Sequence, residues 1–481
     1  MVSVATAGLL LLSTASAFVV SASSGTMTIT KSTTLTEDHV GNIVIATDGV
    51  TLDCAGHTVS GPGTVGESGG IVVPWSNGVT IRRCVVSGFD VNGIYAIGGS
   101  KLRLEKNTVV GNHDAGIWLE ALSGATVFGN DILDNGGNGV VLFGATGVRV
   151  ENNVAKGNTR VGFLLVNTTR STLASNTASG NGEGYTLGSS SDNLVVSNTA
   201  SANTLSPGIG AGTGFWILEG SDGNVLRGNT ASSNANTGFI LDDSDGNRFI
   251  GNTARDNQGD GFAATNLDSA VFTGNKSLAN QSGGFLFQAS TGVRIEGNVA
   301  KDNGPDGGNA FLFVASSDLR VEHNVAKGSP WACFGIYDGT FGATLVGNTA
   351  SGCSAGFDLG SGATGNTLRG NTANRNTHDG VGGNGFSLGD ASANVLAGNT
   401  ANGNNNGFLL VFGADANELT RNTADRNDSY GFVAVDGASD NTFSHNSAHG
   451  NDRSHTDCVD ALDAGIDNAW VHNHFGTTDG I

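Results

Sequence analysis

The chain has 481 residues, with 76 glycines, only 5 prolines and a formal net charge of −20 at pH 7. This acidity disfavours nucleic acid as a partner, because nucleic-acid binding depends on Lys and Arg side chains that neutralise phosphates. It also disfavours a strongly anionic polysaccharide, unless basic residues are gathered locally. No apolar run reaches the length of a transmembrane helix, so we expect no membrane span.

The first residues read MVSVATAGLLLLSTASAF, a short apolar run that ends in the small residues Ala15, Ser16 and Ala17. Such a run followed by small residues is typical of a secretory signal, although the usual positive segment before it is absent. We therefore expect a signal peptide over residues 1–22 and a secreted or cell-surface protein.

Residues 27–36 are expected to cap the open end of a stack of strands, which would otherwise expose unpaired strand edges. The segments GVTLDCAGHTVSG at 49–61 and GVTIRRCVVSGF at 78–89 then begin a series of similar units. Cys54 and Cys84 hold similar places in these two units, and Cys333 and Cys353 lie about one period apart. Neighbouring strands come close enough for disulfides, so we predict both pairs, with Cys458 left over. The alternative is reduced, buried thiols.

The segment GFILDDSDGNRFIGNTARDN at 238–257 is the unit on which most of the chain is built. Counting the small residue before the large apolar one marks fifteen units, at Gly93, Gly116, Gly139, Gly162, Gly184, Gly214, Gly238, Gly261, Gly284, Ala310, Gly335, Gly356, Gly385, Gly407 and Gly431. Each unit has three short β-prone segments separated by Gly, Asn, Asp and Ser. A fixed period of this size with three strands per turn predicts a single all-β parallel β-helix over residues 27–475. It would have about 17 rungs and a length of about 80 Å.

Two residue types recur in these units. An Asn before Thr-Ala tolerates the left-handed backbone of a sharp corner, and stacked Asn side chains can bond from rung to rung. A Phe follows the mark in many units, from Phe163 to Phe432, and predicts a buried aromatic stack whose role is packing.

The VTLD-x-x-GHT-x-SG opening, followed by Gly-Ile and Gly-Phe units with Asn corners, resembles the secreted right-handed parallel β-helix repeat proteins. These include the NosD-like group and lie in the wider pectate-lyase-like superfamily. The similarity covers roughly residues 27–475 and implies a right-handed helix. It implies no single activity, because that superfamily contains lyases, glycosidases, epimerases, phage tailspikes and proteins without known chemistry.

Three insertions interrupt the spacing, between Asn203 and Gly214, Asn303 and Ala310, and Asn376 and Gly385. All fall just before the Gly-Phe segment, so we expect them to build walls on one face. Alternation predicts an outward series on that face, which reads Tyr95, Trp118, Val141, Leu164, Thr186, Trp216, Ile240, Ala263, Leu286, Leu312, Tyr337, Asp358, Ser387, Leu409 and Val433. An apolar stripe of this length is typical of an interface or a binding groove.

Candidate ligand contacts on this stripe are aromatic. Tyr95, Trp118, Trp216 and Tyr337 offer flat faces for sugar rings, and Trp118 and Trp216 would lie four rungs, about 19 Å, apart. The carboxylates beside them are Glu120, Glu219, Asp242 and Asp243. Two carboxylates across a bond can serve as acid and base in glycoside hydrolysis. The alternative is that Asp242 and Asp243 begin an ordinary solvated turn.

Metal and lyase chemistry have less support. The outward stripe contains no Lys, Arg or His, whereas a uronate lyase needs a base and a cation that neutralises the carboxylate. His472 and His474 on one strand would point to one side, as a metal site requires, but an ordinary polar end cap explains them as well. The NosD-like resemblance invites copper there. We predict no cofactor, with calcium possible at Asp242 to Asp245 on ligand type.

Two functions remain open from the sequence. The first is an extracellular carbohydrate-binding or carbohydrate-processing protein, with a polysaccharide or cell-surface glycan along the Gly-Phe-x-Leu face. The second is a non-catalytic cell-surface or assembly protein that uses the apolar face as a homo-oligomer interface.

Overall fold

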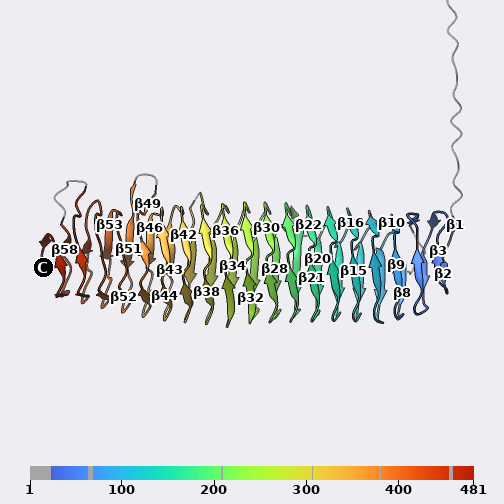
Figure 1. Ribbon diagram of the computed structural model, residues 1–481, viewed down its shortest axis with the longest axis horizontal. Helices are drawn as coiled ribbons and strands as arrows, with labels where there is room; N and C mark the ends of the chain where they lie inside the picture. Colours follow the sequence, from blue (N-terminus) through green and yellow to red (C-terminus); the bar gives the residue numbers. More distant parts are fainter. Residues whose placement is uncertain (1–22, 63–68, 207–209, 306, 379–380, 454–458) are drawn as a thin grey trace, which may run out of the picture.

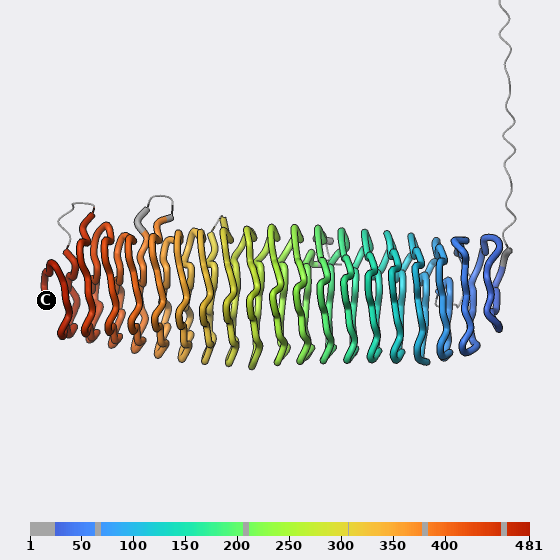
Figure 2. The backbone as a smooth tube through the Cα atoms, in the orientation of Figure 1, coloured from blue at the N-terminus to red at the C-terminus, as the bar shows by residue number. Residues whose placement is uncertain are grey.

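The protein is an all-β solenoid in the computed structural model, which describes residues 23–62, 69–206, 210–305, 307–378, 381–453 and 459–481. The chain winds through about 18 turns, close to the expected 17, and successive turns stack along one axis (Figures 1 and 2). The expected signal peptide at 1–22 lies outside the described residues. The segment expected as a cap already contributes β2 (Met27–Ile29) and β3 (Thr33–Thr34) to the stack.

One turn shows how the unit folds. β31 (Phe239–Asp242), β32 (Asn247–Ile250) and β33 (Thr253–Arg255) are its three strands, and each pairs in parallel with the equivalent strand of the next turn. Repetition of this turn makes three parallel sheets, which we call sheet B, sheet C and sheet A in the order of these strands. Alternate residues of β31 are buried, since successive side chains on a strand point to opposite faces.

Sheet B carries the site described below. Its strands after β2 and before the last two turns are β5 (Ile43–Ile45), β8 (Gly69–Pro74), β11 (Asn92–Ile97), β14 (Ile117–Glu120), β17 (Val140–Phe143), β20 (Val161–Val166), β23 (Glu183–Gly188), β28 (Phe215–Leu218), β31, β34 (Phe262–Thr265), β37 (Phe285–Gln288), β40 (Phe311–Val314), β43 (Ala332–Tyr337), β46 (Ala355–Leu359), β51 (Asn384–Gly389), β53 (Asn406–Val411) and β55 (Phe432–Ala434). It ends with β58 (Ala461–Asp463) and β61 (Thr478–Asp479).

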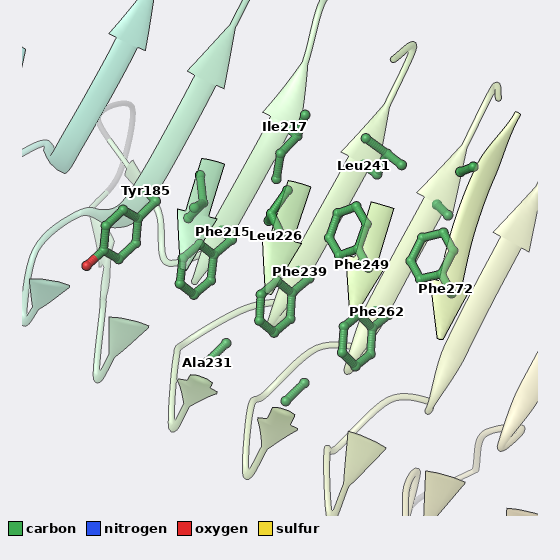
Figure 3. Close-up of a cluster of buried hydrophobic side chains, with 14 of the residues drawn as sticks. Tyr185, Phe215, Ile217, Leu226, Ala231, Phe239, Leu241, Phe249, Phe262 and Phe272 are labelled. Carbon is green, nitrogen blue, oxygen red and sulfur yellow. The ribbon is translucent and has the colours of Figure 1, made fainter. Parts of the chain in front are cut away.

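The core contains one continuous column of aromatic rings, as predicted. It runs through Phe163, Tyr185, Phe215, Phe239, Phe262, Phe285, Phe311, Phe334, Phe357, Phe386, Phe408 and Phe432, and Figure 3 shows part of it. The ring of Phe239 lies 4.8 Å from that of Phe262, centroid to centroid. This spacing equals the rise between rungs, so each ring packs on the next.

The aromatic column shows that the sequence marked one unit at the wrong residue. Phe334 pairs with Phe311, so the residue before it, Cys333, holds the position that the sequence assigned to Gly335. The misplacement arises because Gly335 also precedes a large apolar residue. Tyr337 therefore aligns with Val314, two residues along the strand from its expected place. A shift of two residues keeps a side chain on the same face, so Tyr337 still points outward.

Buried Asn side chains form ladders along the corners, as expected, but the left-handed residue beside Asn252 is the preceding Gly251, with a φ of 62°, and not the Asn. Asn252 is typical: its Nδ2 donates to the Leu226 carbonyl at 2.9 Å and to Oδ1 of Asn275 on the next rung at 3.0 Å. Asn229 in turn donates to Asn252. Each buried amide thus forms hydrogen bonds with the amides of neighbouring rungs and with a backbone carbonyl. These bonds offset the cost of burying polar groups and fix the register of the rungs.

Both predicted disulfides are confirmed. Cys54 bonds to Cys84 and Cys333 bonds to Cys353, with Cα–Cα distances of 4.7 Å and 5.6 Å. Cys54 and Cys84 link neighbouring rungs, where the strand spacing brings them together. Cys333 lies on β43 and Cys353 follows β45, so this disulfide closes a single turn instead of joining two rungs as expected. Cys458 lies outside the described residues.

The three insertions leave the stack at one corner, as expected. Each lies between a strand of sheet A and the next strand of sheet B. The first contains β26 (Leu205–Ser206) and β27 (Gly210–Ala211), the second spans 304–309, and the third contains β49 (Thr377–His378) and β50 (Val381–Gly382), seen at one edge of the stack in Figure 1. The second insertion borders the outward face of sheet B, because Gly307 and Gly308 line a hollow together with Leu286 and Leu312.

Candidate functional site

The outward face of sheet B carries two columns of side chains. The first column is Tyr95, Trp118, Val141, Leu164, Thr186, Trp216, Ile240, Ala263, Leu286, Leu312, Gly335, Asp358, Ser387, Leu409 and Val433. The second column includes Glu120, Phe143, Val166, Gly188, Asp242, Thr265, Gln288, Val314 and Tyr337. The face is mainly apolar, and most of its side chains are half-buried.

Three of the predicted aromatic contacts, Tyr95, Trp118 and Trp216, lie in the N-terminal half of this face, and Tyr337 lies in the C-terminal half. Trp118 and Trp216 are four rungs apart in the first column, as expected, and both are half-buried. Their indole N–H groups are buried and make no hydrogen bond. These side chains therefore offer apolar surface and no polar group to a ligand. The Tyr95 hydroxyl donates to Oε2 of Glu120 at 2.9 Å.

The predicted carboxylates separate into two groups. Glu219 and Asp243 are exposed at adjacent rungs of one corner, with φ angles of 55° and 44°, and Asp242 accepts a hydrogen bond from the Thr265 hydroxyl. Glu120 lies on β14, four rungs away from β28, which precedes Glu219. That separation of about 19 Å is too long for one acid and base pair.

A hollow opens on the C-terminal half of the same face, over β43, β46, β51 and β53. It has a volume of about 450 Å³ and is lined by Tyr337, Asp358, Leu359, Gly360, Ser361, Ser387, Gly389, Asp390, Leu409, Val411 and Phe412; we call it the Asp358 hollow. It exists because glycines replace side chains here: a Cβ on Gly360 would lie 3.5 Å from Cδ1 of Tyr337. The ring of Phe412 is 70 % exposed and forms an apolar wall.

Asp358 is the chemically distinctive group of this hollow. The Tyr337 hydroxyl donates to Oδ2 of Asp358 at 2.6 Å. Burial raises the pKa of Asp358 above its usual value, against the opposing effect of hydrogen bonds from Tyr337 and Ser387. Burial and then the charge of Asp358 raise the pKa of Tyr337 as well. A carboxyl that tends to keep its proton can act as a general acid.

A second hollow of about 260 Å³ adjoins the other end of β43. Trp331, which precedes this strand, is 59 % exposed and lies beside Gly307 of the second insertion. Asp260 lines the same hollow, and burial raises the pKa of its carboxyl, against a hydrogen bond from the backbone of Gly283. β43 thus connects two hollows, each with an exposed aromatic ring and a carboxyl whose pKa is raised.

Sequence reasoning did not select Asp358, Phe412, Trp331 or Asp260. One signal was available for Asp358, because it is the sole charged residue in the outward series read from the sequence. Trp331 lies one rung after the second insertion, where a wall was expected. Asp260 lies at the end of an ordinary unit, and the unit pattern does not single it out. Phe412 follows the first strand of its unit at a corner where the neighbouring rungs have Asp390 and Asp436, so its ring was an available signal.

These features define a parallel β-helix repeat protein with a hollowed outward face. The family model of the right-handed β-helix region matches residues 16–177, 69–231, 160–254 and 209–350, which together cover more than half of the sequence. The chain therefore belongs to the right-handed β-helix family. The model of the periplasmic copper-binding protein NosD matches residues 299–478, so the C-terminal part is NosD-like. No curated protein sequence matches the chain.

Several solved structures are similar at low identity. The periplasmic alginate epimerase AlgG has 12 % identity over 69 % of this chain and 77 % of that chain, with a TM-score of 0.37. The mannuronan C-5 epimerase AlgE4 A-module of Azotobacter vinelandii has 14 % identity over 91 % of each chain, with a TM-score of 0.34. The catalytic unit of the GH87 α-1,3-glucanase of Streptomyces thermodiastaticus strain HF3-3 has 14 % identity over 76 % of this chain and 61 % of that chain, with a TM-score of 0.28. At these values the likeness carries no information on the activity of this chain.

The NosD description raises the question of copper, and the residues that the structure describes do not fit it. His472 has a φ of 55° at the corner between β59 (Ala469–Val471) and β60 (His474–Phe475), so the expectation that His472 and His474 share one strand is wrong. Their rings pair instead with His445 and His449 on the preceding rung. Within the described ranges, no group of three or more His, Cys, Asp or Glu could hold a metal ion.

Two observations bear on location. The two disulfides are typical of proteins outside the cytoplasm, where thiols are oxidised. In the part of the chain that the structure describes, no helix has the length and apolar character needed to cross a bilayer.

Proposed function

We propose that this protein processes a carbohydrate outside the cytoplasm, with the glycan along the outward face of sheet B and Asp358 as the proton donor. The observation that carries the proposal is the Asp358 hollow, where a carboxyl with a raised pKa lies beside an exposed aromatic ring. Sugar rings bind flat aromatic and apolar surfaces, and glycosidic bonds break when their oxygen is protonated.

The hollow favours hydrolysis over elimination or epimerisation. Asp358 donates its proton to the leaving-group oxygen, and the exposed carboxylate of Asp390 lines the same space as the second carboxylate that hydrolysis uses. The lining residues include no Lys, Arg or His that would neutralise a uronate carboxylate. A glycan without charge at the cleaved bond is therefore the preferred substrate.

The remaining face extends the binding surface. Tyr95, Trp118 and Trp216 lie in the same column as Asp358, so an extended glycan that follows this column contacts their rings. The second hollow, which Trp331 lines, lies between these residues and Asp358 and offers a further stacking position. Glu219, Asp242 and Asp243 on neighbouring rungs form a second proposed set of catalytic carboxylates. Glu120 accepts the hydrogen bond of the Tyr95 hydroxyl and takes no part in the proton transfer at Asp358.

A glycan array tests binding first. Wild-type protein, Trp118→Ala and Trp216→Ala are applied with and without calcium, which also tests the possible calcium site. Selective binding by the wild type, weakened by both substitutions in folded protein, supports the proposal. The glycan found is then incubated with wild type, Asp358→Asn and Asp243→Asn, and release of reducing ends identifies the catalytic carboxylate. Absence of binding by folded wild type would contradict the proposal.

The second candidate is a non-catalytic assembly protein. The observation that favours it is the length of the apolar first column, in which the rings of Trp118 and Trp216 are already half-buried. A second copy seated on this column would cover both rings. Light scattering decides: a dimer or trimer whose tryptophan fluorescence resists quenching supports assembly, and a monomer contradicts it.

A further inference from the structure

We propose a second, separate site: a pocket near the C-terminal end that binds oxyanions carried by a polymer. It lies at the corner that follows sheet A, away from the outward face of sheet B, and goes beyond the proposed function. The pocket has a volume of about 680 Å³, and its lining includes Arg375, Arg426 and Arg453. We call it the arginine pocket.

The shape of the pocket comes from an alternation of Arg and Gly. The corner position is occupied in successive rungs by Gly352, Arg375, Gly403, Arg426 and Gly450, all with positive φ between 55° and 68°. Glycine adopts this backbone without strain, whereas a residue with a Cβ is strained there. Gly403 leaves open the space between the two arginines, since a Cβ on it would lie 3.6 Å from Cγ of Arg375.

The charge of this corner changes along the stack. Rungs further towards the N-terminus place Asp134, Asp256 and Asp302 at the same position, where the last rungs place arginines. Arg375 and Arg426 are exposed and form no ion pair with any described residue, and Arg453 approaches Asp428 only at 3.9 Å. In a chain with a net charge of −20, a cluster of three guanidinium groups concentrates positive potential at one place.

The lining also supplies neutral donors. Oδ1 of Asn374 accepts the backbone N–H of Asn402, and Oδ1 of Asn402 accepts that of Asp425. Both Asn residues line the pocket, and among the described residues their Nδ2 groups have no acceptor. The next member of this ladder, Asp425, is engaged by the backbone N–H of His449. Guanidinium forks and amide N–H groups together match the geometry of carboxylate, sulfate and phosphate oxygens.

The spacing indicates a polymer rather than a single ion. Arg375 and Arg426 lie two rungs apart, which is about 10 Å along the axis. One small anion cannot contact both guanidinium groups at that separation unless the side chains converge. A chain with anionic groups on successive units, such as an acidic polysaccharide, can contact both without such convergence.

Fluorescence anisotropy of labelled oligosaccharides with the full-length protein tests the site. The probes are a sulfated heparin oligosaccharide, a carboxylated oligogalacturonate and neutral dextran, which separate the two anion sources. We expect at least one anionic probe to bind, dextran not to bind, and Arg375→Gly and Arg426→Gly each to weaken binding about tenfold. Both substitutions restore the residue that neighbouring rungs use, so the unfolding temperature should not fall.

Arg421→Gly is the matched control. Arg421 also has positive φ, at 53°, is exposed and lies outside the lining, so its substitution removes the same charge from another corner. Unchanged binding by Arg421→Gly supports the site. The proposal is overturned if Arg421→Gly weakens binding as much as Arg375→Gly, if neither anionic probe binds, or if millimolar inorganic sulfate displaces the probe completely.

Discussion

Two tyrosine–carboxylate pairs on the same face of sheet B have different surroundings. In the N-terminal half, Tyr95 donates to Glu120 among large apolar side chains, and burial together with this hydrogen bond raises the pKa of Tyr95 to about 12. In the C-terminal half, Tyr337 donates to Asp358 at the floor of a hollow, and burial raises the pKa of both partners. The same hydrogen bond thus serves a surface contact in one place and a carboxyl prepared to hold a proton in the other.

The largest effect expected from this difference is on turnover. Asp358→Asn removes the proton donor, and general acid catalysis contributes about 10²- to 10⁴-fold to a rate. We therefore expect at least a 100-fold loss of reducing-end release, whereas Glu120→Gln, the matched change in the other pair, should stay within about threefold of wild type. Equal losses in both variants, each folded by circular dichroism, would remove the distinction between the pairs.

The second-largest effect is expected on glycan binding when the Asp358 hollow is filled. Gly389→Leu places a side chain in the Asp358 hollow, and its Cβ would lie 3.7 Å from Cγ2 of Val411, so the backbone need not move. We expect about a tenfold rise in the glycan dissociation constant, near 1.4 kcal/mol. Gly188→Leu is the control in the N-terminal half, where a Cβ would meet only Oε2 of Glu219 at 3.9 Å. A larger effect from Gly188→Leu would place the ligand there instead.

Removal of the aromatic wall should have a smaller effect. Phe412→Ala deletes a ring that is 70 % exposed, and aromatic contacts of this kind contribute about 0.5 to 1.5 kcal/mol. Calorimetric titration should show a loss of roughly two- to tenfold in affinity. Phe143→Ala, the exposed ring beside Trp118, serves as the comparison, with little change expected.

The smallest expected effect is on how the unfolding temperature depends on pH. The folded-state pKa of Asp358 lies above its usual value of 3.8, so the folded protein binds that proton more tightly than the unfolded chain does. The resulting contribution to the free energy of unfolding is fully present at low pH and is lost as the pH rises through the raised pKa of Asp358. The unfolding temperature of wild type should therefore fall relative to that of Asp358→Asn between pH 4 and pH 8. A constant difference across this range would show that Asp358 is not perturbed.

The inside of the molecule was predictable and the hollow was not. The Phe position of Phe239 recurs in most units and the Asn position of Asn252 in nearly all, because every rung must pack and satisfy the same interior, so repetition alone revealed them. Function depends on departures from the unit. Gly360 and Gly389 open the hollow, and the register near Cys333 that places Tyr337 beside Asp358 becomes visible only when the rungs are aligned in space.

A crystal structure of Asp358→Asn soaked with the glycan identified on the array would test the central claim most directly. The account predicts density in the Asp358 hollow, with one sugar ring against Phe412 and the bond to be cleaved beside residue 358. Density confined to the region of Tyr95, Trp118 and Trp216, with the hollow empty at a saturating glycan concentration, would contradict it.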